Sequence, residues 1–367
     1  MKIVLINNGK GWGGGQEHLK DLALELRNSG VEVHFLVRAD TVCESRFAAL
    51  GFPVYLMPYR HGLGDLKALC RLVGIMRKER FDIISINREH DLLMTALAWR
   101  IAFPFGGSGK LMMSYHSATD RKQPMLGVTD AVVCISEFVR TRLLRVNPAA
   151  ATKTAILYNG IVLPQPPDRS KFRLDRARRF FTGTGFPLIG MVGELYKNQM
   201  ELMDVIPLLK QHYRHVKVAF VGDDTDQRLL VPLLEKLRQL GVEENVIFTG
   251  RVPRDRIPDV FYDLDLSVST FRNEGFGIVH LESLAAGTPV VAYNEGGVVD
   301  ILTGERAGVL VEGRLQEFAA AVVDLLDDHE RRFAMGEEGY NLVSRTYSVQ
   351  AMGRSYLDFY RKLSGAS

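Results

Sequence analysis

The sequence predicts an α/β protein with two doubly wound domains, each built on a parallel sheet. Three observations support this. The chain has 367 residues, more than one ordinary hydrophobic core holds. In both halves, short apolar runs rich in β-branched residues alternate with helical stretches, as in sheets whose parallel strands are joined by crossover helices. Between the halves, Pro164, Pro166 and Pro167 interrupt the alternation and predict a linker. The basic residues that follow them predict a basic surface segment: Arg169, Lys171, Arg173, Arg176, Arg178 and Arg179.

The first half opens with an apolar run at 2–7, which suits a strand buried on both faces. Apolar residues three and four apart then form the stripe of a helix over 17–28, and Gly30 ends it. Helices lie between most of the later strands, which are expected at 31–37, 54–57, 82–86, 110–115, 131–135 and 154–158.

After the linker the alternation resumes, with strands expected at 188–192, 216–222, 246–250, 266–269, 289–292 and 308–311. Helices are expected at 201–211, 229–240, 278–286, 315–327 and 330–345. A last amphipathic helix at about 348–363 should place its apolar and aromatic side chains in a core, namely Met352, Tyr356, Phe359 and Tyr360. The predicted domains are 1–165 and 186–346, with a linker at 166–185 and a C-terminal helix segment at 347–367.

Composition limits the class of protein. With 46% hydrophobic and 24% charged residues, the chain is a folded soluble protein rather than a disordered, collagen-like or coiled-coil one. Three scattered cysteines, Cys43, Cys70 and Cys134, are too few for a disulfide framework or a zinc cluster and favour a reduced cytoplasm. We expect neither a signal peptide nor a membrane span, because Arg100 and Pro104 interrupt the most apolar stretch.

The charge is distributed unevenly. The whole chain carries +3, but residues 1–185 hold 27 basic and 16 acidic side chains, a net +11, and residues 186–367 carry −8. A basic first domain indicates a polyanionic partner, either nucleic acid, an anionic membrane or a phosphorylated substrate, or simply a solvated surface. The helix expected at 66–80 has Lys or Arg at five positions beside its apolar stripe. It suits an anionic membrane, an anionic acceptor, or ordinary packing with a basic outer face.

A glycine-rich loop joins the first strand to the first helix. Gly9, Gly11 and Gly14 match the G-x-G-x-x-G pattern, so a dinucleotide site is one interpretation. The acidic residue that such a site needs at the end of the second strand is ambiguous, because Arg38 and Asp40 both lie there. A phosphate or sugar-phosphate loop is the broader interpretation. We prefer it to a dinucleotide site and to a flexible surface turn.

The segment 271–297 is the most informative. Glu274 follows the strand at 266–269, at the sheet edge where open α/β folds bind ligands. Gly275 and Gly277 allow the backbone to approach a ligand closely, and a helix begins directly after them. Glu282 lies on that helix. Two carboxylates at this spacing suit the vicinal hydroxyls of a sugar and of a ribose.

This segment resembles the E-x7-E region of the family-4 glycosyltransferases of the GT-B fold, with E-G-F-G, a second Glu on a helix, A-G-x-P-V-V-A and a final G-G. Other pieces that resemble the family follow in the family's order along nearly the whole chain: Gly13-Gly14-Gly15, Ser136-Glu137, the run at 158–161, Val192-Gly193 with Lys197, Val221-Gly222, and the run at 248–252.

The resemblance implies two Rossmann-like domains that face each other across a cleft, with the last helix crossing back to the first domain. It implies a retaining transferase that uses a nucleotide-diphosphate sugar, such as a UDP-sugar, with Glu274 and His116 at the reacting centre, Glu282 on the ribose and Lys197 on the diphosphate. The implied donor-binding residues are Gly13, Gly14, Gly15, Gly193, Lys197, Arg251, Val252, Gly275, Phe276, Gly277 and Glu282.

At one position this chain departs from the family pattern. The family usually has Arg directly after the glycine that matches Gly193, whereas this chain has Glu194. Glu194 cannot bind phosphate as Arg does, so Arg251 or Arg272 could substitute.

The D-x-D triplet at 263–265, a metal motif in GT-A transferases, leads straight into a buried strand here and is expected to be structural. We predict metal-independent chemistry without a cofactor, because no cluster has metal-ligand spacing.

The expected function is therefore sugar transfer to a glycan or lipid-linked acceptor, in bacterial envelope polysaccharide or lipopolysaccharide synthesis. The expected location is the cytoplasm, including the inner face of the membrane, and nucleic acid is not expected as a partner. Two alternatives stay open. One is an NAD(P)-dependent oxidoreductase that uses the loop of Gly9, Gly11 and Gly14, and the other is a non-catalytic sugar or nucleic-acid binder.

Overall fold

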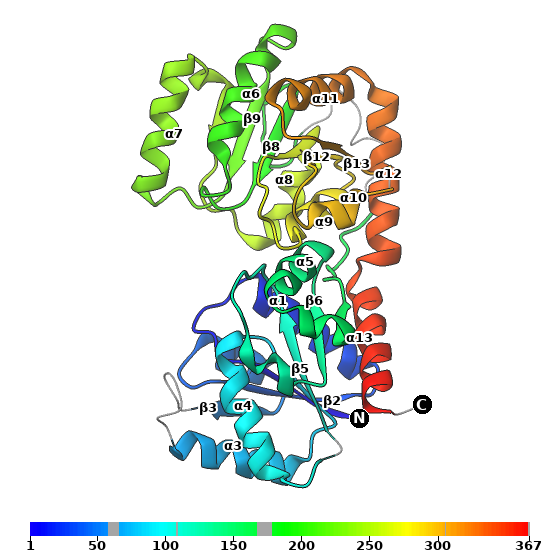
Figure 1. Ribbon diagram of the computed structural model, residues 1–367. Coiled ribbons are helices and arrows are strands. Elements are labelled where there is room, and N and C mark those ends of the chain that lie inside the picture. The colour runs from blue at the N-terminus through cyan, green and yellow to red at the C-terminus, as the bar shows by residue number, and fades with distance from the viewer. Residues whose placement is uncertain (58–65, 108, 167–177, 305, 366–367) are drawn as a thin grey trace. The chain divides into compact units, whose positions relative to one another are not determined.

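The computed structural model describes residues 1–57, 66–107, 109–166, 178–304 and 306–365. The chain forms two compact units, drawn in Figure 1. Unit 1 comprises Met1–Val162 and Ser348–Ser367, and unit 2 comprises Leu163–Tyr347. Each unit holds one sheet, so both halves of the sequence have the predicted doubly wound architecture.

The sheet of unit 1 has seven parallel strands in the order β3-β2-β1-β4-β5-β6-β7. Its strands are β1 Lys2–Asn7, β2 Glu32–Arg38, β3 Val54–Met57, β4 Ile83–Ile86, β5 Lys110–Tyr115, β6 Ala131–Cys134 and β7 Thr154–Ile156. The helices of this unit are α1 Gly14–Asn28, α2 Val42–Ala49, α3 Leu66–Glu79, α4 Glu89–Ala102, α5 Glu137–Val146 and α13 Val349–Ser364. The strands form because their apolar runs are buried on both faces, as in β1.

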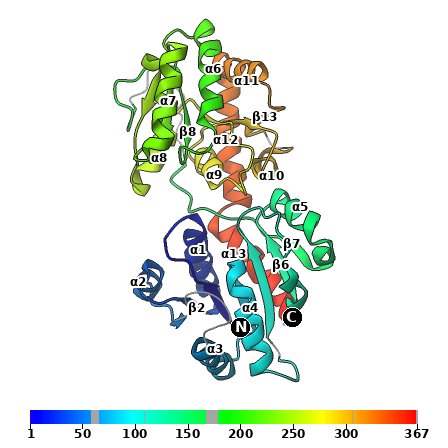
Figure 2. The same cartoon turned by 60° about the vertical axis from the view of Figure 1, so that its left-hand side comes forward.

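The C-terminal helix α13 belongs to the core of unit 1 and lies beside α1 (Figure 2). Tyr356 and Tyr360 are fully buried, which confirms the prediction that the aromatic side chains of this helix are core residues. Gly353 lets the helix approach closely, because a Cβ there would lie 2.7 Å from the Cβ of Glu25 on α1. The backbone N–H of Gly160 also donates to the sulfur of Met352, at 3.1 Å.

The sheet of unit 2 has six parallel strands in the order β10-β9-β8-β11-β12-β13. Its strands are β8 Leu188–Val192, β9 Lys217–Val221, β10 Val246–Phe248, β11 Leu266–Ser269, β12 Val290–Tyr293 and β13 Gly308–Val311. Its helices are α6 Gln199–His212, α7 Gln227–Leu240, α8 Ile257–Asp263, α9 Ile278–Ala285, α10 Val298–Leu302, α11 Leu315–Asp327 and α12 His329–Thr346.

Both strand orders reverse direction at one point, between β1 and β4 in unit 1 and between β8 and β11 in unit 2. At such a point the loops leave neighbouring strands toward opposite faces of the sheet, so a crevice opens at their carboxyl ends. Each sheet therefore has one favoured place for a ligand. None of the helices in the described part of the chain is long and apolar enough to cross a membrane.

The D-x-D triplet is structural, as predicted. Asp263 is fully buried, and its carboxylate accepts the backbone N–H groups of Arg179, Phe180 and Phe181 at 2.6–2.8 Å. Three amides around one carboxylate fix the chain where it enters unit 2. This use of the side chain leaves the triplet in a buried hydrogen-bond network rather than in a crevice.

One sequence-based expectation is wrong here. Arg178 was expected in a basic surface segment of the linker, but it is buried and forms an ion pair with Asp265 at 3.0 Å. The cause is the second acid of the triplet, which offers a buried guanidinium a charged partner; the carbonyl oxygens of Thr184 and Gly185 accept from the same guanidinium. Arg179 of the same segment is exposed, as expected. The remaining basic residues of the segment lie outside the described residues: Arg169, Lys171, Arg173 and Arg176.

We expect Asp263→Ala to lower the free energy of unfolding by about 2–4 kcal/mol, because three buried amides would lose their acceptor. Denaturation in urea, followed by circular dichroism, measures the change. Asp259→Ala is the matched control, since Asp259 lies on the same helix but pairs with Arg256 at the surface, and its effect should stay within about 0.5 kcal/mol. An equal loss in the two variants would contradict the structural role of Asp263.

Candidate active site

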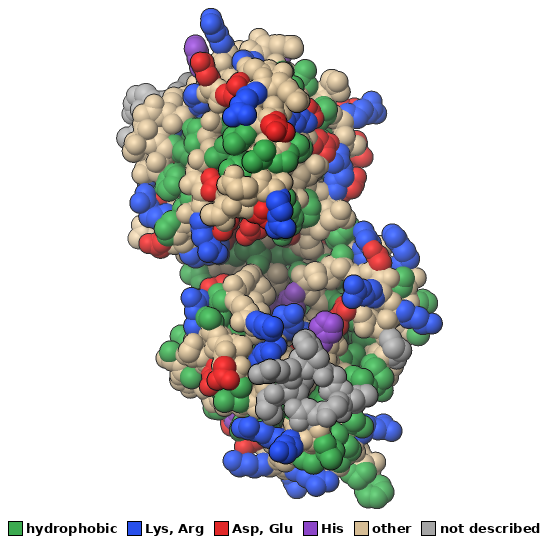
Figure 3. Space-filling view, turned by 90° about the vertical axis from the view of Figure 1, so that its left-hand side faces the viewer, with side chains coloured by type: hydrophobic (Ala, Val, Ile, Leu, Met, Phe, Trp, Pro, Cys, Tyr) green, Lys and Arg blue, Asp and Glu red, His purple; other side chains and the backbone are tan. Residues whose placement is uncertain are grey.

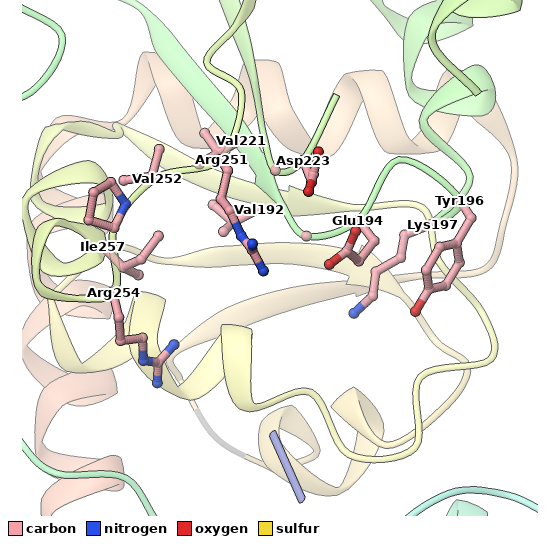
Figure 4. Close-up of a pocket in the computed structure, with 13 residues that line it drawn as sticks. Val192, Glu194, Tyr196, Lys197, Val221, Asp223, Arg251, Val252, Arg254 and Ile257 are labelled. Atoms are coloured by element: carbon pink, nitrogen blue, oxygen red, sulfur yellow. The ribbon is translucent and has the colours of Figure 1, made fainter. Parts of the chain in front are cut away.

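Unit 2 has a pocket of about 590 Å³ at the carboxyl ends of β8 and β9 (Figure 4). Four residues that the sequence predicts for donor binding line it, namely Gly193, Lys197, Arg251 and Val252. The remaining lining residues are Val192, Glu194, Tyr196, Val221, Gly222, Asp223, Pro253, Arg254 and Ile257. The pocket thus brings together the loops after β8, β9 and β10.

The predicted cation and the predicted carboxylate meet beside this pocket. The Nζ of Lys197 lies 2.6 Å from Oε2 of Glu274, and the two side chains are 19% and 20% exposed. Lys197 comes from the loop after β8 and Glu274 from the loop after β11, the two strands at the switch point of the sheet. Residues 77 positions apart in sequence therefore form one site.

Glycines allow the loops of this site to pack backbone against backbone. A Cβ at Gly222 would lie 2.1 Å from the carbonyl oxygen of Gly193, and a Cβ at Gly297 would lie 2.4 Å from the Cα of Phe276. The N–H of Gly297 also donates to the carbonyl of Glu274 at 2.8 Å. Any side chain at Gly222 or Gly297 would displace the loop that carries a predicted site residue.

Helix α9 begins where the sequence places it, and its first turn faces the same region. Gly277 is the N-cap with φ +95°, a conformation that favours glycine. The side chain of Phe276 is buried, so any contact of this turn with a ligand would involve its backbone. Glu282 is largely buried and forms an ion pair with Arg254. Burial raises the pKa of Glu282, and Arg254 opposes that rise.

Of the two arginines considered as substitutes at Glu194, only Arg251 faces the pocket. Figure 4 shows its guanidinium pointing into the pocket, and it makes no ion pair with any described residue. Arg272 is held instead by Glu201, with Nη1 and Nη2 at 2.6 and 2.8 Å from the two carboxylate oxygens. The side chain of Glu194 also lines the pocket, so the departure from the family pattern lies inside the candidate site.

Unit 1 has a second pocket, of about 340 Å³, at the switch point of its own sheet. It is lined by residues in or after the carboxyl ends of β1, β4 and β5: Asn7, Gly15, Gln16, Asn87, Arg88, Glu89, His90, Met113, Ser114, Tyr115, His116 and Ser117. Gly13 is the N-cap of α1, and Gly14 and Gly15 form its first turn. A Cβ at either of the last two would meet no other atom within 4 Å, so packing does not require glycine there.

The surroundings of His116 define its protonation state. The amide nitrogen of Asn87 donates to the carbonyls of Ser85 and Ile6, at 3.1 and 3.3 Å, so its oxygen faces Nε2 of His116 at 3.1 Å. Nε2 must then carry the proton. Burial lowers the pKa of His116 to about 4, and its Nδ1 has no partner among the described residues. The ring therefore offers a free acceptor at neutral pH.

A second histidine, His18 of α1, packs against the ring of His116. Its ring centroid lies 5.0 Å from that of His116 at 60°, and Tyr356 of α13 lies 3.5 Å from its Nε2. Burial keeps the pKa of His18 well below its usual value, and the nearby His116 lowers it further. Two neutral imidazoles thus pack together, and no motif in the sequence indicates the second one.

No group of three or more His, Cys, Asp or Glu side chains is arranged to hold a metal ion within the described ranges. The sequence-predicted residues fall into two sets, one in each unit. The pocket of unit 2 is lined by Gly193, Lys197, Arg251 and Val252, and Glu274 contacts Lys197 beside it. The adjoining loop and helix α9 carry Gly275, Phe276, Gly277 and Glu282. His116 and Gly15 line the pocket of unit 1, with Gly13 and Gly14 next to it.

Two family models match the chain. The Glycosyltransferase Family 4 model matches residues 12–164, and the model for glycosyl transferases group 1 matches residues 177–342. A D-inositol 3-phosphate glycosyltransferase of Corynebacterium kroppenstedtii is 32% identical over 389 residues, which cover 95% of this chain and 85% of that enzyme. The chain therefore belongs to the family-4 glycosyltransferases, as the sequence motifs indicated.

Two further relatives extend the comparison. A GDP-mannose-dependent alpha-(1-6)-phosphatidylinositol monomannoside mannosyltransferase of Mycobacterium tuberculosis H37Rv is 31% identical over 254 residues, 64% of this chain. That match spans 62% of the relative, less than two thirds of its length. The structure of Anabaena Alr3699/HepE in complex with UDP superposes with a TM-score of 0.81 at 21% identity, over 99% of this chain and 100% of that one. This likeness confirms the GT-B fold.

We expect the imidazole of His116 to remain neutral, with the proton on Nε2, from pH 8 down to about pH 5, and to titrate near pH 4. Nitrogen-15 NMR of histidine-labelled protein measures this. Because the folded pKa lies below the unfolded value of about 6.5, protons favour the unfolded state, so this group lowers stability as the pH falls from about 6.5 to 4.

Asn87→Asp is the matched variant for this experiment. A carboxylate facing Nε2 stabilises the imidazolium and should raise the pKa of His116. Titration of the unsubstituted protein near pH 6.5, or a pKa that stays unchanged in Asn87→Asp, would contradict the hydrogen-bond arrangement described above.

Proposed function

We propose that this protein is a retaining glycosyltransferase that moves a sugar from a nucleoside-diphosphate sugar to a hydroxyl of a glycan or lipid-linked acceptor. The observation that carries the proposal is the contact of Lys197 with Glu274 at the switch point of unit 2, beside a pocket large enough for a nucleotide. A cation for the diphosphate and a carboxylate for sugar hydroxyls stand next to each other there. Family membership supports the same chemistry.

The donor diphosphate would lie between Lys197 and Arg251, whose side chains both face the pocket (Figure 4). Negative charge gathers on the diphosphate as the glycosidic bond breaks, so fixed cations lower that barrier. Arg251 supplies the charge that Glu194 cannot. The backbone at 275–277, at the start of α9, would bind the sugar or the phosphate next to it.

The two carboxylates would bind the donor by exchanging partners. In the structure Glu274 is paired with Lys197 and Glu282 with Arg254. A bound donor offers phosphate to the cations and hydroxyls to the carboxylates, so each ion pair is replaced by two contacts with the ligand. Glu282 then accepts from the ribose and Glu274 from the transferred sugar.

Unit 1 would supply the neutral His116, whose free Nδ1 can accept a hydrogen bond from a sugar hydroxyl. In the reaction, the bond between the anomeric carbon and the diphosphate oxygen breaks. The acceptor oxygen bonds to the same face of that carbon, and its proton passes to the departing diphosphate. Retention of configuration and independence from metal ions are part of this proposal, on the basis of the family resemblance.

The substrate class is an activated sugar and a bacterial envelope acceptor. The relatives' names specify GDP-mannose, phosphatidylinositol mannoside and inositol phosphate, and the Anabaena structure contains UDP. These names support a nucleotide sugar and an acceptor that is a lipid or carries phosphate. Envelope polysaccharide or lipopolysaccharide synthesis is the setting that we propose for this reaction. They lend no support to the dinucleotide alternative.

We expect Glu274→Gln to reduce transfer at least about 100-fold while the affinity for the nucleotide stays within a few fold, because only the contact with the transferred sugar is lost. Release of UDP or GDP across a panel of donors and acceptors measures transfer, and calorimetry with UDP and GDP measures affinity. Glu330→Gln is the matched control, since Glu330 is an exposed acid at the start of α12 in the same unit and pairs with His329. Turnover by Glu274→Gln at the level of this control would refute the site.

Arg251→Gln tests nucleotide binding separately from sugar transfer, by the same calorimetry with UDP and GDP. Loss of a cation opposite the diphosphate should weaken UDP or GDP binding about 10-fold or more. Arg314→Gln serves as the control, because Arg314 pairs with Glu317 at the surface of unit 2. Unchanged nucleotide affinity in Arg251→Gln would show that another group replaces the family arginine.

We also propose that unit 1 rests on an anionic membrane through α3 and α4, which pack side by side. The most apolar stretch of the sequence forms α4 and the turn after it, yet Leu93, Ile101 and Phe105 are exposed. A helix that is apolar on its outer face as well as its inner face suits an interface with lipid. Arg77 of α3 fixes the end of α4 by donating to the carbonyl of Ile101 at 3.0 Å.

Positive charge surrounds this apolar stripe. Exposed side chains on α3 and α4 carry it: Lys67, Arg71, Lys78 and Arg100. Figure 3 shows how Lys and Arg gather over the visible face of unit 1. Basic side chains at a membrane surface contribute about 1 kcal/mol each, so four of them suit a leaflet rich in anionic lipid.

We expect the protein to float with vesicles that contain phosphatidylglycerol and not with pure phosphatidylcholine. The double substitution Ile101→Ser with Phe105→Ser should reduce flotation about 10-fold, because both apolar contacts are lost. Val231→Ser is the control, since Val231 is as exposed as Ile101 but lies on α7 of unit 2. Equal binding to both kinds of vesicle, or no effect of the double substitution, would contradict this surface.

A further inference from the structure

A second ion pair lies behind the pair of Lys197 and Glu274. Glu201 of α6 receives both terminal nitrogens of Arg272, at 2.6 and 2.8 Å, and the hydroxyl of Tyr293 at 2.7 Å. The amide nitrogen of Asn198 donates to the same carboxylate. One acid thus accepts four hydrogen bonds from three separate segments of unit 2.

Each of these segments carries a piece of the proposed donor site. Asn198 directly follows Lys197, and Arg272 lies two residues before Glu274. The first two segments are also tied to each other, because Asn198 donates to the carbonyl of Thr270 at 3.1 Å and accepts from the Thr270 hydroxyl at 2.8 Å. The positions of the Lys197 and Glu274 side chains therefore depend on one shared network.

The third segment is the end of β12. Tyr293 is buried against the core, with its ring 5.1 Å from that of Phe318, and the guanidinium of Arg272 lies 4.0 Å from its ring centroid. Three residues further on, Gly296 and Gly297 pack against the backbone of the Glu274 loop. The network therefore joins the core of unit 2 to both loops.

The charges in this network are matched. Burial alone would raise the pKa of Glu201, but hydrogen bonds from Arg272, Tyr293 and Asn198 outweigh it and the pKa is lowered. The hydrogen bond to Glu201 likewise raises the pKa of Arg272. The carboxylate and the guanidinium are thus both charged across the working pH range. Without Arg272, the partly buried Glu201 loses its charged partner, and without Glu201, Arg272 keeps the more distant carboxylate of Glu295, at 3.6 Å from its Nε.

We propose that Glu201 and Arg272 are positioning residues of the donor site, which hold Lys197 and Glu274 at the distance that sugar transfer requires. This inference rests on the proposed function. Neither residue needs to touch the donor. A displacement of about 1 Å at a reacting group costs about 100-fold in rate, so the network matters for turnover more than for binding the nucleotide.

A competing role for Arg272 is direct contact with the diphosphate. The geometry opposes this, because both terminal nitrogens are committed to Glu201 and the guanidinium stacks on Tyr293. If Arg272 moved to a phosphate, Glu201 would lose its charged partner. The two roles predict different results for the same variants.

The test compares Glu201→Gln, Arg272→Gln and the double variant. Positioning predicts that each single substitution lowers kcat about 10- to 100-fold, and that the double variant is no worse than either single one, because both break the same network. The Kd for UDP or GDP should change less than about 3-fold. Direct contact would instead weaken nucleotide binding in Arg272→Gln alone, and additive losses would refute a shared network.

Two further variants grade the effect. Tyr293→Phe keeps the ring under Arg272 and removes one hydrogen bond, so its loss of kcat should be the smallest of the set. Asp204→Asn is the matched control, since Asp204 is also an acid of α6 but pairs with Lys236 at 2.6 Å, outside the network. It should leave kcat unchanged.

Hydrogen exchange tests the network of Glu201 and Arg272 without an activity assay. In Glu201→Gln, the amides at 194–198 and 272–277 should exchange about 10-fold faster, whereas those of β8 and β9 should not change. If the unsubstituted protein transfers no sugar from any donor, the proposed function fails while the exchange result still tests the network. Unchanged exchange in both loops, together with normal kcat, would overturn the inference.

Discussion

Direct contact between backbone segments at the carboxyl edge of the second sheet is the constraint on which the rest of the site depends. The loop after β8 touches the loop after β9 at Gly193 and Gly222, and the loop after β12 touches the loop after β11 at Gly297 and Phe276. No side chain fits between these segments. Because the loops lie so close together, side chains from distant parts of the sequence converge on one pocket, and small shifts of one loop are passed to the next.

The same closeness explains why the polar groups of the pocket are paired with one another. Glu274 and Glu282 are both partly buried, where an isolated carboxylate would be costly, and each has a cation from another loop within contact distance. Such pairs suit a site for a ligand that has both negative charge and hydroxyl groups. The ligand replaces each half of a pair with a suitable partner, so neither charge is left unsatisfied.

Much of the fold was predictable from sequence, because each strand is a short apolar run and each helix a periodic one. The position of Glu274 was predictable too, since it follows a strand at the sheet edge where ligands bind. The choice of Lys197 came from the family resemblance. Arg254 and Glu201 were not predictable, because a charged residue on a helix or loop looks the same in sequence whether it faces solvent or a partner 28 or 71 residues away. Arg178 was misjudged for the same reason, since its partner Asp265 lies 87 residues along the chain.

The glycines also show which parts of the site could not be predicted from sequence. Gly13, Gly14 and Gly15 are conspicuous in sequence, yet a side chain would find open space at the last two. Gly222 and Gly297 stand in less conspicuous places and have no room for a side chain at all. A run of glycines indicates a loop whose backbone is exposed to a ligand, whereas the need for glycine at one position depends on a neighbour that only the fold brings near.

Charge is the last point at which sequence and structure must be combined. Divided by the structural units rather than at residue 185, the chain carries +9 in unit 1 and −6 in unit 2. An acidic unit is a poor environment for a diphosphate unless the local field differs from the average. Here it does, because the pocket lining holds three basic side chains, Lys197, Arg251 and Arg254, against the two acids Glu194 and Asp223, a net +1 in a unit of −6. Glu201 neutralises Arg272 away from the pocket. Net charge therefore describes how a unit meets a large partner, and the few side chains at the pocket decide which small ligand it binds.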